Sequence, residues 1–330
     1  MSEKLGVRSI LLLSIKVVLS AVLLFVLIRR MPAGEISAAL RSANPMWLAG
    51  AALLLLLSNV FGSYQWSRLL RAVDIHIPFW KVLAYYHVGL FFNNFLPANV
   101  GGDIARVVDA SRYASTRTAA VATVLLDRMI GTLSLAGLAL VTTLPALDRF
   151  HLTVLYLALL AFFALSVTMV WAVFHPRALH VVEAMLDRLG LGRLRPSLDE
   201  LAHRLSHYRG QRPLMLQLLF VGLITQLSRV GVHVLVGRAL GLTVPTTYFF
   251  LFVPLLAVIV SLPISLNGIG VREGAGVLLF GLVGVERAQA FSLQFTTYLV
   301  SVAVSLLGGL IFLARLPHRR AEARQAGRSS

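Results

Sequence analysis

Residues 79–106 read FWKVLAYYHVGLFFNNFLPANVGGDIAR, and residues 246–273 read TTYFFLFVPLLAVIVSLPISLNGIGVRE. Each stretch begins as an apolar run and is then interrupted by a proline, Pro97 or Pro263, and by glycines. Proline and glycine free backbone polar groups that hydrocarbon cannot satisfy. We therefore predict two broken helices. Each break is expected to be buried in protein or to line a water-filled cavity.

The two breaks share a spacing. Gly102 and Arg106 follow the first proline by five and nine residues, and Gly268 and Arg272 follow the second proline at the same intervals. A pair of Gly/Pro-interrupted apolar segments in corresponding halves is the best sequence pointer to a transporter binding site. The spacing favours an internal repeat, and the predicted topology makes that repeat an inverted one.

The composition excludes a water-soluble protein. Of 330 residues 58% are apolar and only 13% are charged, about half the ~25% of a soluble domain. The mean hydropathy is +0.81. The net charge of +16 lies mostly between apolar runs, which is typical of the positive-inside rule and of anionic headgroups rather than of nucleic-acid binding. The chain contains no cysteine.

The predicted fold class is an all-α integral membrane protein with about six full spans and two re-entrant or broken-helix hairpins. A span needs about 20 apolar residues. The run after Lys4 and Arg8 is longer than a signal-peptide core and lacks a cleavage site, so it is predicted to be the first span. The predicted spans are Ser9–Ile28, Met46–Tyr64, Thr118–Leu144, Leu152–Phe174, Pro213–Val236 and Arg287–Ala314.

Loop charge predicts the orientation. The 175–212 loop carries seven Arg and four acidic residues, and the 315–330 tail carries five Arg and one Glu. Both are expected in the cytoplasm, with both termini, in a cell (inner) membrane. Residues 1–314 form one predicted transmembrane domain. Ser197 and Glu200 form a capping box for an amphipathic helix in the loop, either a connector on the inner leaflet or a gate that recruits lipid.

A helix that restarts inside the membrane presents free N–H groups, and these groups with the helix dipole and an arginine attract a phosphate. Guanidinium groups grip phosphate with two hydrogen bonds. The candidate lipid-phosphate residues are Arg106, Arg272, Gly101, Gly102, Gly268, Gly270, Asn93, Asn94 and Asn267. The asparagines have a second interpretation, in which they satisfy carbonyls freed at the break.

Charges inside the spans predict a second set of residues. Asp127 and Arg128 lie about ten residues into a span, where each costs about 2.5–3.5 kcal/mol unless it avoids lipid. Helix neighbours point about 100° apart, so each needs a partner on another segment. The available partners are Arg106 or Arg272 for Asp127, and Asp103 or Glu273 for Arg128. This network acts either as struts for the hairpins or as a gate that rearranges during transport.

A further polar stripe lies on the 213–236 span. Gln226, Arg229 and His233 follow one another at helical spacing on one face. An arginine at this depth is a functional hypothesis by default. We expect Arg229 and His233 to belong to the same gating charge network.

Three motifs together resemble the flippase-like, lysylphosphatidylglycerol synthase transmembrane-region family: FLPANVGGDIAR at 95–106, Leu126-Asp127-Arg128, and LPISLNGIGVRE at 262–273. The middle motif more often reads Glu-Arg in that family. The resemblance implies a membrane protein that moves an anionic or polyprenyl-linked lipid. The family's synthases continue into a soluble aminoacyl transferase, which is not expected here, so synthase activity is not carried over.

The sequence supports three functions. The first is a flippase-like transporter of an anionic phospholipid or polyprenyl-phosphate-linked lipid. The second is an accessory membrane subunit of envelope lipid or glycolipid synthesis, which binds lipid and an envelope-synthesis enzyme without transport. The third is an intramembrane enzyme with Asp127 or Glu273 as general base. No catalytic or nucleotide-binding motif appears, so we expect a non-enzyme without cofactor or metal.

Overall fold

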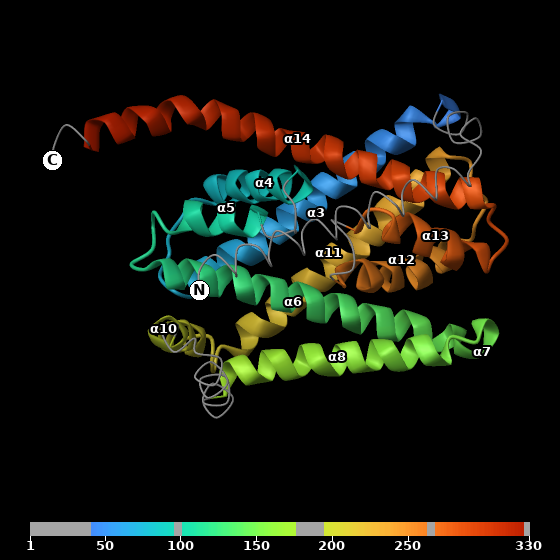
Figure 1. Ribbon diagram of the computed structural model, residues 1–330, viewed down its shortest axis with the longest axis horizontal. Coiled ribbons are helices and arrows are strands. Elements are labelled where there is room, and N and C mark those ends of the chain that lie inside the picture. The colour runs from blue at the N-terminus through green and yellow to red at the C-terminus, as the bar shows by residue number, and fades with distance from the viewer. Residues whose placement is uncertain (1–40, 96–100, 176–194, 263–267, 327–330) are drawn as a thin grey trace, which may run out of the picture.

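The computed structural model describes residues 41–95, 101–175, 195–262 and 268–326. These residues form helices and no strand, which confirms the all-α fold class (Figure 1). The elements are α3 (Pro45–Arg71), α4 (Phe79–Phe95), α5 (Gly101–Ala110), α6 (Arg117–Thr143), η1 (Leu144–Ala146), α7 (Leu147–Phe150), α8 (Thr153–Phe174), α10 (Arg195–Ser206), α11 (Arg212–Ala239), α12 (Thr246–Ser261), α13 (Val271–Gly281) and α14 (Arg287–Ala326).

Five described segments are long and apolar enough to cross a membrane: Pro45–Arg71, Arg117–Phe150, Thr153–Ala172, Arg212–Ala239 and Arg287–Arg315. They coincide with five of the six predicted spans. The predicted first span, Ser9–Ile28, lies outside the described residues. The protein is therefore a multi-pass membrane protein.

Local sequence sets the ends of these spans. The side chain of Asn44 accepts a hydrogen bond from Met46 N at 2.9 Å, and Pro45 occupies the first turn of α3. Thr116 caps α6 in the same way through Ala119 N. At the end of α11, Gly241 has φ +73°, a left-handed conformation that stops a helix and favours glycine.

The first broken segment is a hairpin, α4–α5, that begins and ends at one end of the bundle (Figure 1). We call this the α10 end. There α3 finishes, α6 begins, and the Tyr208 hydroxyl donates to Leu69 O at 2.7 Å. The α14 residue Arg315 also reaches Asp109 of α5 at this end, with Nη–Oδ distances of 3.1 and 3.2 Å.

The second broken segment is a hairpin, α12–α13, that begins and ends at the opposite end of the bundle. We call this the α7 end. There the Phe150 ring packs against the rings of Tyr248 and Phe252 from α12. The two hairpins therefore point into the bundle from opposite ends, which is the arrangement that an inverted repeat predicts (Figure 1).

The arms of both hairpins are shorter than the five described spans. The longer arms, α4 and α12, contain 17 and 16 residues, or about 25 Å at 1.5 Å per residue. The shorter arms, α5 and α13, contain 10 and 11 residues, or about 16 Å. The hydrocarbon core is about 30 Å thick, so the geometry favours re-entrant hairpins over four full spans.

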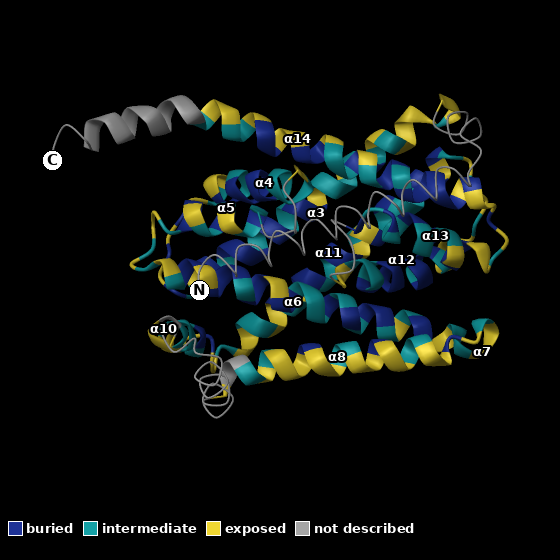
Figure 2. Cartoon of the chain, viewed as in Figure 1, coloured by how far each residue is buried: buried dark blue, intermediate teal, exposed yellow. Residues whose placement is uncertain are grey.

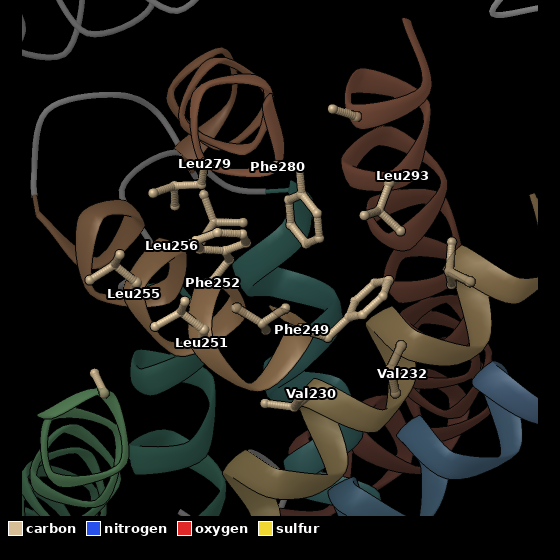
Figure 3. Packing of buried hydrophobic residues seen from close by; sticks show 14 of the residues in the cluster. Val230, Val232, Phe249, Leu251, Phe252, Leu255, Leu256, Leu279, Phe280 and Leu293 are labelled. Carbon is tan, nitrogen blue, oxygen red and sulfur yellow. The ribbon is translucent and has the colours of Figure 1, made fainter. Parts of the chain in front are cut away.

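The buried core is richest around the second hairpin. Phe252 of α12 and Phe280 of α13 lie with ring centroids 5.4 Å apart, and both rings are fully buried (Figure 3). By contrast α8 is exposed along most of its length (Figure 2). Its mean hydropathy of 2.3 makes it a lipid-facing helix.

The 175–212 loop contains the predicted helix as α10. This helix packs against α6 and α8. Its own Leu205 and the following Tyr208 are buried. Hydroxyl groups of Thr116 and Thr118 donate to the Glu200 carboxylate and lower its pKa below the ordinary value. Of the two predicted interpretations, these contacts favour a docked connector.

Candidate functional site

A buried ion pair joins the first hairpin to α6. Nη2 of Arg106 donates to Oδ2 of Asp127 at 2.7 Å, and Nε2 of Gln65 on α3 donates to Oδ1 of the same carboxylate at 2.8 Å. The two charged side chains are only 5% and 8% exposed. Of the two partners that the sequence offered to Asp127, the structure selects Arg106.

Two aromatic rings hold the Arg106 guanidinium in place. Its Cζ lies 4.3 Å from the ring centre of Trp66 and 5.0 Å from that of Tyr86. Trp66 is itself fixed by a 3.1 Å hydrogen bond to Thr123 Oγ1. A desolvated cation between aromatic faces gains about 2 kcal/mol or more from each good contact. The guanidinium of Arg106 is therefore packed against the two aromatic rings as well as paired with Asp127.

Arg128 forms the second predicted pair, with Asp103. Its Nε and Nη2 contact the Asp103 carboxylate at 2.9–3.1 Å in a fork arrangement. Asp103 also lies 3.9 Å from Arg106 Nη1, so the four side chains form one network. We call Asp103, Arg106, Asp127 and Arg128 the α5–α6 charge cluster. It holds two cations and two carboxylates and is neutral overall.

The first helix restart is capped by protein. Oδ1 of Asn93 accepts a hydrogen bond from Gly102 N at 2.9 Å. Asn93 thus satisfies a freed N–H group, whereas the sequence had suggested freed carbonyls. A Cβ on Gly102 would overlap the carbonyl oxygen of Gly89, so glycine lets α4 and α5 touch through their backbones.

The second restart is capped by its own helix. Gly268 and Gly270 have φ of +74° and +82°, which only glycine adopts without strain. Oε2 of Glu273 then accepts from Gly270 N at 2.7 Å. Glu273 is therefore a buried helix cap, rather than the partner of Arg128 that the sequence allowed.

Arg272 faces a cavity. Its Nε lies 3.8 Å from Glu273 Oε1, and its Cζ lies 4.5 Å from the ring centre of Tyr298 on α14. A cavity of about 270 Å³, the first cavity, lies beside it between α6, α11, α12 and α13. The first cavity is lined by Leu135, Leu138, Gln226, Arg229, Val230, His233, Val253, Pro254, Leu256, Ala257, Val260 and Arg272.

A second cavity of about 250 Å³ lies between α3, α4, α11 and α14. It is lined by Leu55, Asn59, Leu90, Asn94, Arg229, Val232, His233, Thr297, Ser301, Val304 and Ser305. Arg229 and His233 line both cavities. The predicted polar stripe on α11 is therefore the common wall of two cavities, one at each hairpin.

Arg229 is the exposed cation of this wall. It lies 10 residues before the end of α11, or about 15 Å, which is near the middle of a 30 Å hydrocarbon core. Among the residues that the structure describes, no carboxylate lies within ion-pair distance of its guanidinium. The lining of the first cavity thus combines mostly aliphatic side chains with two arginines, Arg229 and Arg272, a chemistry that suits an amphiphilic anion.

The predicted residues thus fall into two groups. Gly101, Gly102, Asn93, Asp103, Arg106, Asp127 and Arg128 gather at the first hairpin. Asn94, Arg229, His233, Gly268, Gly270, Arg272 and Glu273 gather at the two cavities and the second restart. Pro97, Pro263 and Asn267 lie outside the described residues.

Sequence reasoning missed several members of both groups. Gln65 and Trp66 of α3 belong to the surroundings of Arg106, and Asn59 of α3 lines the second cavity. Asn59 carried a usable signal, because it is an amide in the interior of an apolar span. Trp66 carried none, since aromatic residues are common near the ends of spans.

Comparison with known proteins shows to which family this chain belongs. Residues 13–309 match the lysylphosphatidylglycerol synthase TM region. A UPF0104 membrane protein of Pyrococcus horikoshii is 24% identical over 288 residues, covering 80% of this chain and 85% of its own length. A UPF0104 membrane protein of Methanothermobacter thermautotrophicus is 30% identical over 142 residues, 42% of each chain. The chain therefore belongs to the family of the lysylphosphatidylglycerol synthase TM region.

Proposed function

We propose that this protein is a flippase-like transporter that binds the phosphate of an anionic phospholipid or a polyprenyl-phosphate-linked lipid between Arg229 and Arg272. The phosphate lies at the edge of the first cavity, and the lipid chain leaves along its aliphatic wall. The two hairpins then expose this position alternately to the two sides of the membrane.

The position of Arg229 carries the proposal. An arginine at the centre of a span costs about 2.5–3.5 kcal/mol on insertion scales, and among the described residues no carboxylate offsets that cost. An anion that enters the cavity would offset it. A lipid phosphate is the anion that a membrane supplies in greatest amount, and the lipid chain suits the leucine and valine side chains around Arg229.

The α5–α6 charge cluster has a different role in this proposal. Arg106 was expected to bind phosphate, but here it is enclosed by Asp127 and two aromatic rings. The proposal therefore gives Arg106 and Asp127 the role of a fixed strut. The more exposed Arg128–Asp103 pair is the part of the network that can open during transport.

The proposed orientation places the α10 end in the cytoplasm of a cell that carries the protein in its inner membrane. Basic residues gather at this end of the described chain, including Arg68, Arg71, Lys81, Arg112 and Arg117. Such clusters favour the cytoplasmic side. The first hairpin then opens toward the cytoplasm and the second toward the outside.

The test is movement of a labelled lipid in reconstituted vesicles. Full-length protein should accelerate the translocation of fluorescent phosphatidylglycerol over protein-free vesicles. Arg229→Gln should lower the accelerated rate about ten-fold or more, because it removes a charge-assisted contact worth about 1.5–3 kcal/mol.

The matched control is Arg238→Gln on the same helix. Arg238 is exposed at the end of α11, where it stacks on Trp47 at 5.4 Å, and it lines neither cavity. Its rate should match that of the wild type. The proposal fails if wild-type protein moves phosphatidylglycerol and polyprenyl phosphate no faster than empty vesicles, or if Arg229→Gln keeps the full rate.

The accessory-subunit function makes a different prediction from the same site. It requires lipid binding that depends on Arg229, no translocation, and a co-purifying envelope-synthesis enzyme. The intramembrane-enzyme function is disfavoured by the carboxylates themselves. Asp127 accepts from an arginine and a glutamine, and Glu273 accepts from a backbone N–H, so neither is arranged as a base facing a cavity.

A further inference from the structure

The two cavities differ in the chemistry of their walls. In the first cavity most of the lining residues are leucine, valine, proline or alanine. In the second cavity five lining residues are neutral and polar: Asn59, Asn94, Thr297, Ser301 and Ser305. Because Arg229 and His233 belong to both walls, a phosphate beside Arg229 has an apolar space on one side and a hydrogen-bonding space on the other.

The Asn59 amide favours a polar occupant in the second cavity. Its side chain is 5% exposed, and within the described part of the chain its amide makes no hydrogen bond. A buried amide without a hydrogen bond costs about 1–3 kcal/mol. The amide lines the cavity, so a hydrogen-bonding guest in that cavity removes the cost.

The hydroxyl groups of α14 define what kind of guest fits. The Thr297 hydroxyl donates to Leu293 O at 2.8 Å, and the Ser305 hydroxyl donates to Val302 O at 2.8 Å. Each hydroxyl oxygen then retains lone pairs that accept hydrogen bonds. The guest must therefore bring donors, which a hydroxyl group or an amine can supply.

Charge decides between those two donors. The part of the wall that the structure describes contains Arg229 and no carboxylate. An ammonium group there would meet a like charge without a compensating anion, in a site of low dielectric. Hydroxyl groups meet no such penalty. The volume of about 250 Å³ is slightly below the ~300–1,000 Å³ of pockets for drug-sized ligands, so it suits one polyol or one sugar.

We infer that the second cavity holds the neutral, hydroxyl-rich headgroup of the transported lipid, while its phosphate lies at Arg229 and its hydrocarbon begins in the first cavity. This inference rests on the proposed function and narrows its substrate class. The substrate is a lipid phosphate that carries a glycerol-like or sugar-like headgroup, rather than one that carries an amine.

The test compares three phospholipids with identical acyl chains: phosphatidylglycerol, phosphatidylpropanol and phosphatidylethanolamine. Phosphatidylpropanol keeps the phosphate charge and nearly the size of phosphatidylglycerol but lacks both headgroup hydroxyls. Binding to the full-length protein in detergent is measured by competition with a fluorescent phosphatidylglycerol. Phosphatidylglycerol should bind at least ten-fold more tightly than either of the other two lipids.

Variants of the second cavity test whether its side chains cause the preference for phosphatidylglycerol. Asn59→Leu and Thr297→Val should bring phosphatidylglycerol down to the affinity of phosphatidylpropanol and leave phosphatidylpropanol itself unchanged. Thr296→Val is the matched control, because Thr296 is the buried neighbour of Thr297 on α14 and lines neither cavity. It should keep the full preference.

The outcomes separate this inference from the proposed function. Equal binding of phosphatidylglycerol and phosphatidylpropanol to the wild type overturns the inference and leaves the phosphate site intact. A preference that survives both Asn59→Leu and Thr297→Val also overturns it. Binding of all three phospholipids no tighter than that of uncharged diacylglycerol would remove the proposed phosphate site itself.

Discussion

The two re-entrant hairpins share a proline, a glycine and an arginine at equal spacing, yet they use the arginine differently. Arg106 of α4–α5 is sealed in an ion pair between two aromatic rings, whereas Arg272 of α12–α13 borders a cavity. The helices start at different points of the repeat. Arg106 is the sixth residue of α5, and Arg272 is the second residue of α13.

That difference of about one helical turn separates a structural hairpin from a binding hairpin. In α4–α5 the extra turn carries the guanidinium past the restart and into the aromatic residues of α3 and α4. In α12–α13 the guanidinium stays at the restart, next to the cavity. Two segments with the same spacing of proline, glycine and arginine can therefore place the arginine in different surroundings.

Arg106→Leu gives the largest expected loss of stability. It leaves the Asp127 carboxylate buried with only Gln65 as a partner, which should lower the free energy of unfolding by about 3–5 kcal/mol. Chemical unfolding in mixed micelles measures this loss. The double variant R106L/D127L should recover most of it, and a single variant as stable as the wild type would contradict the strut role of Arg106.

The stability of the α4–α5 hairpin, which contains Arg106, should also depend on a glycine. Gly102→Ala places a methyl group against the carbonyl of Gly89, and separating α4 from α5 should cost about 1–3 kcal/mol. Gly131→Ala on α6 is the control, because a Cβ there meets no atom within 4 Å. Gly131→Ala should be neutral or slightly stabilising, since alanine favours a helix over glycine. Equal effects of the two substitutions in the unfolding assay would refute close α4–α5 packing.

The α12–α13 hairpin should lose less stability when the helix cap of α13 is removed. Glu273→Ala takes away the acceptor of Gly270 N and should cost about 1 kcal/mol, the usual value of a helix N-cap. Glu273→Gln keeps an acceptor oxygen at the same reach and should retain most of the stability. Hydrogen exchange of the α13 amides distinguishes the two, and identical exchange in both variants would argue against the cap.

Arg128→Gln should give the smallest effect on stability. Its side chain is 49% exposed, and Asp103 keeps its contact with Arg106 Nη1 at 3.9 Å when Arg128 is replaced, so the loss should be well below that of Arg106→Leu. Unfolding of the variant should therefore differ little from that of the wild type, in contrast to Arg106→Leu. A loss of several kcal/mol would mean that the Arg128–Asp103 pair is a second strut rather than the part of the network that opens.

How far the sequence predicted these features depends on the cost of each group in a membrane. Asp127 and Arg128 had to find partners across helices, and that requirement alone reduced the choice to two residues for each. The choice between Arg106 and Arg272 required the helix register of the restart, which spacing does not contain. That the two hairpins enter from opposite ends was predictable from the three spans that the sequence places between them.

The missed features share a physical reason. Thr297 and Ser305 donate to their own helix, so in the sequence they are indistinguishable from lipid-facing hydroxyl residues. Asp109 lies at the end of α5 and Arg315 at the end of the apolar span of α14, where charges are ordinary, and only the packing of α14 against the first hairpin brings them together. Such contacts depend on tertiary arrangement and leave no local pattern.

The position of a bound lipid phosphate tests the comparison of the two hairpins most directly. It can be measured by electron cryomicroscopy of the full-length protein in nanodiscs that contain phosphatidylglycerol. We expect phosphate density within hydrogen-bonding distance of Arg229 and next to Arg272, with the Arg106–Asp127 pair intact. Phosphate density at Arg106 and Gly102, with that ion pair broken, would contradict it.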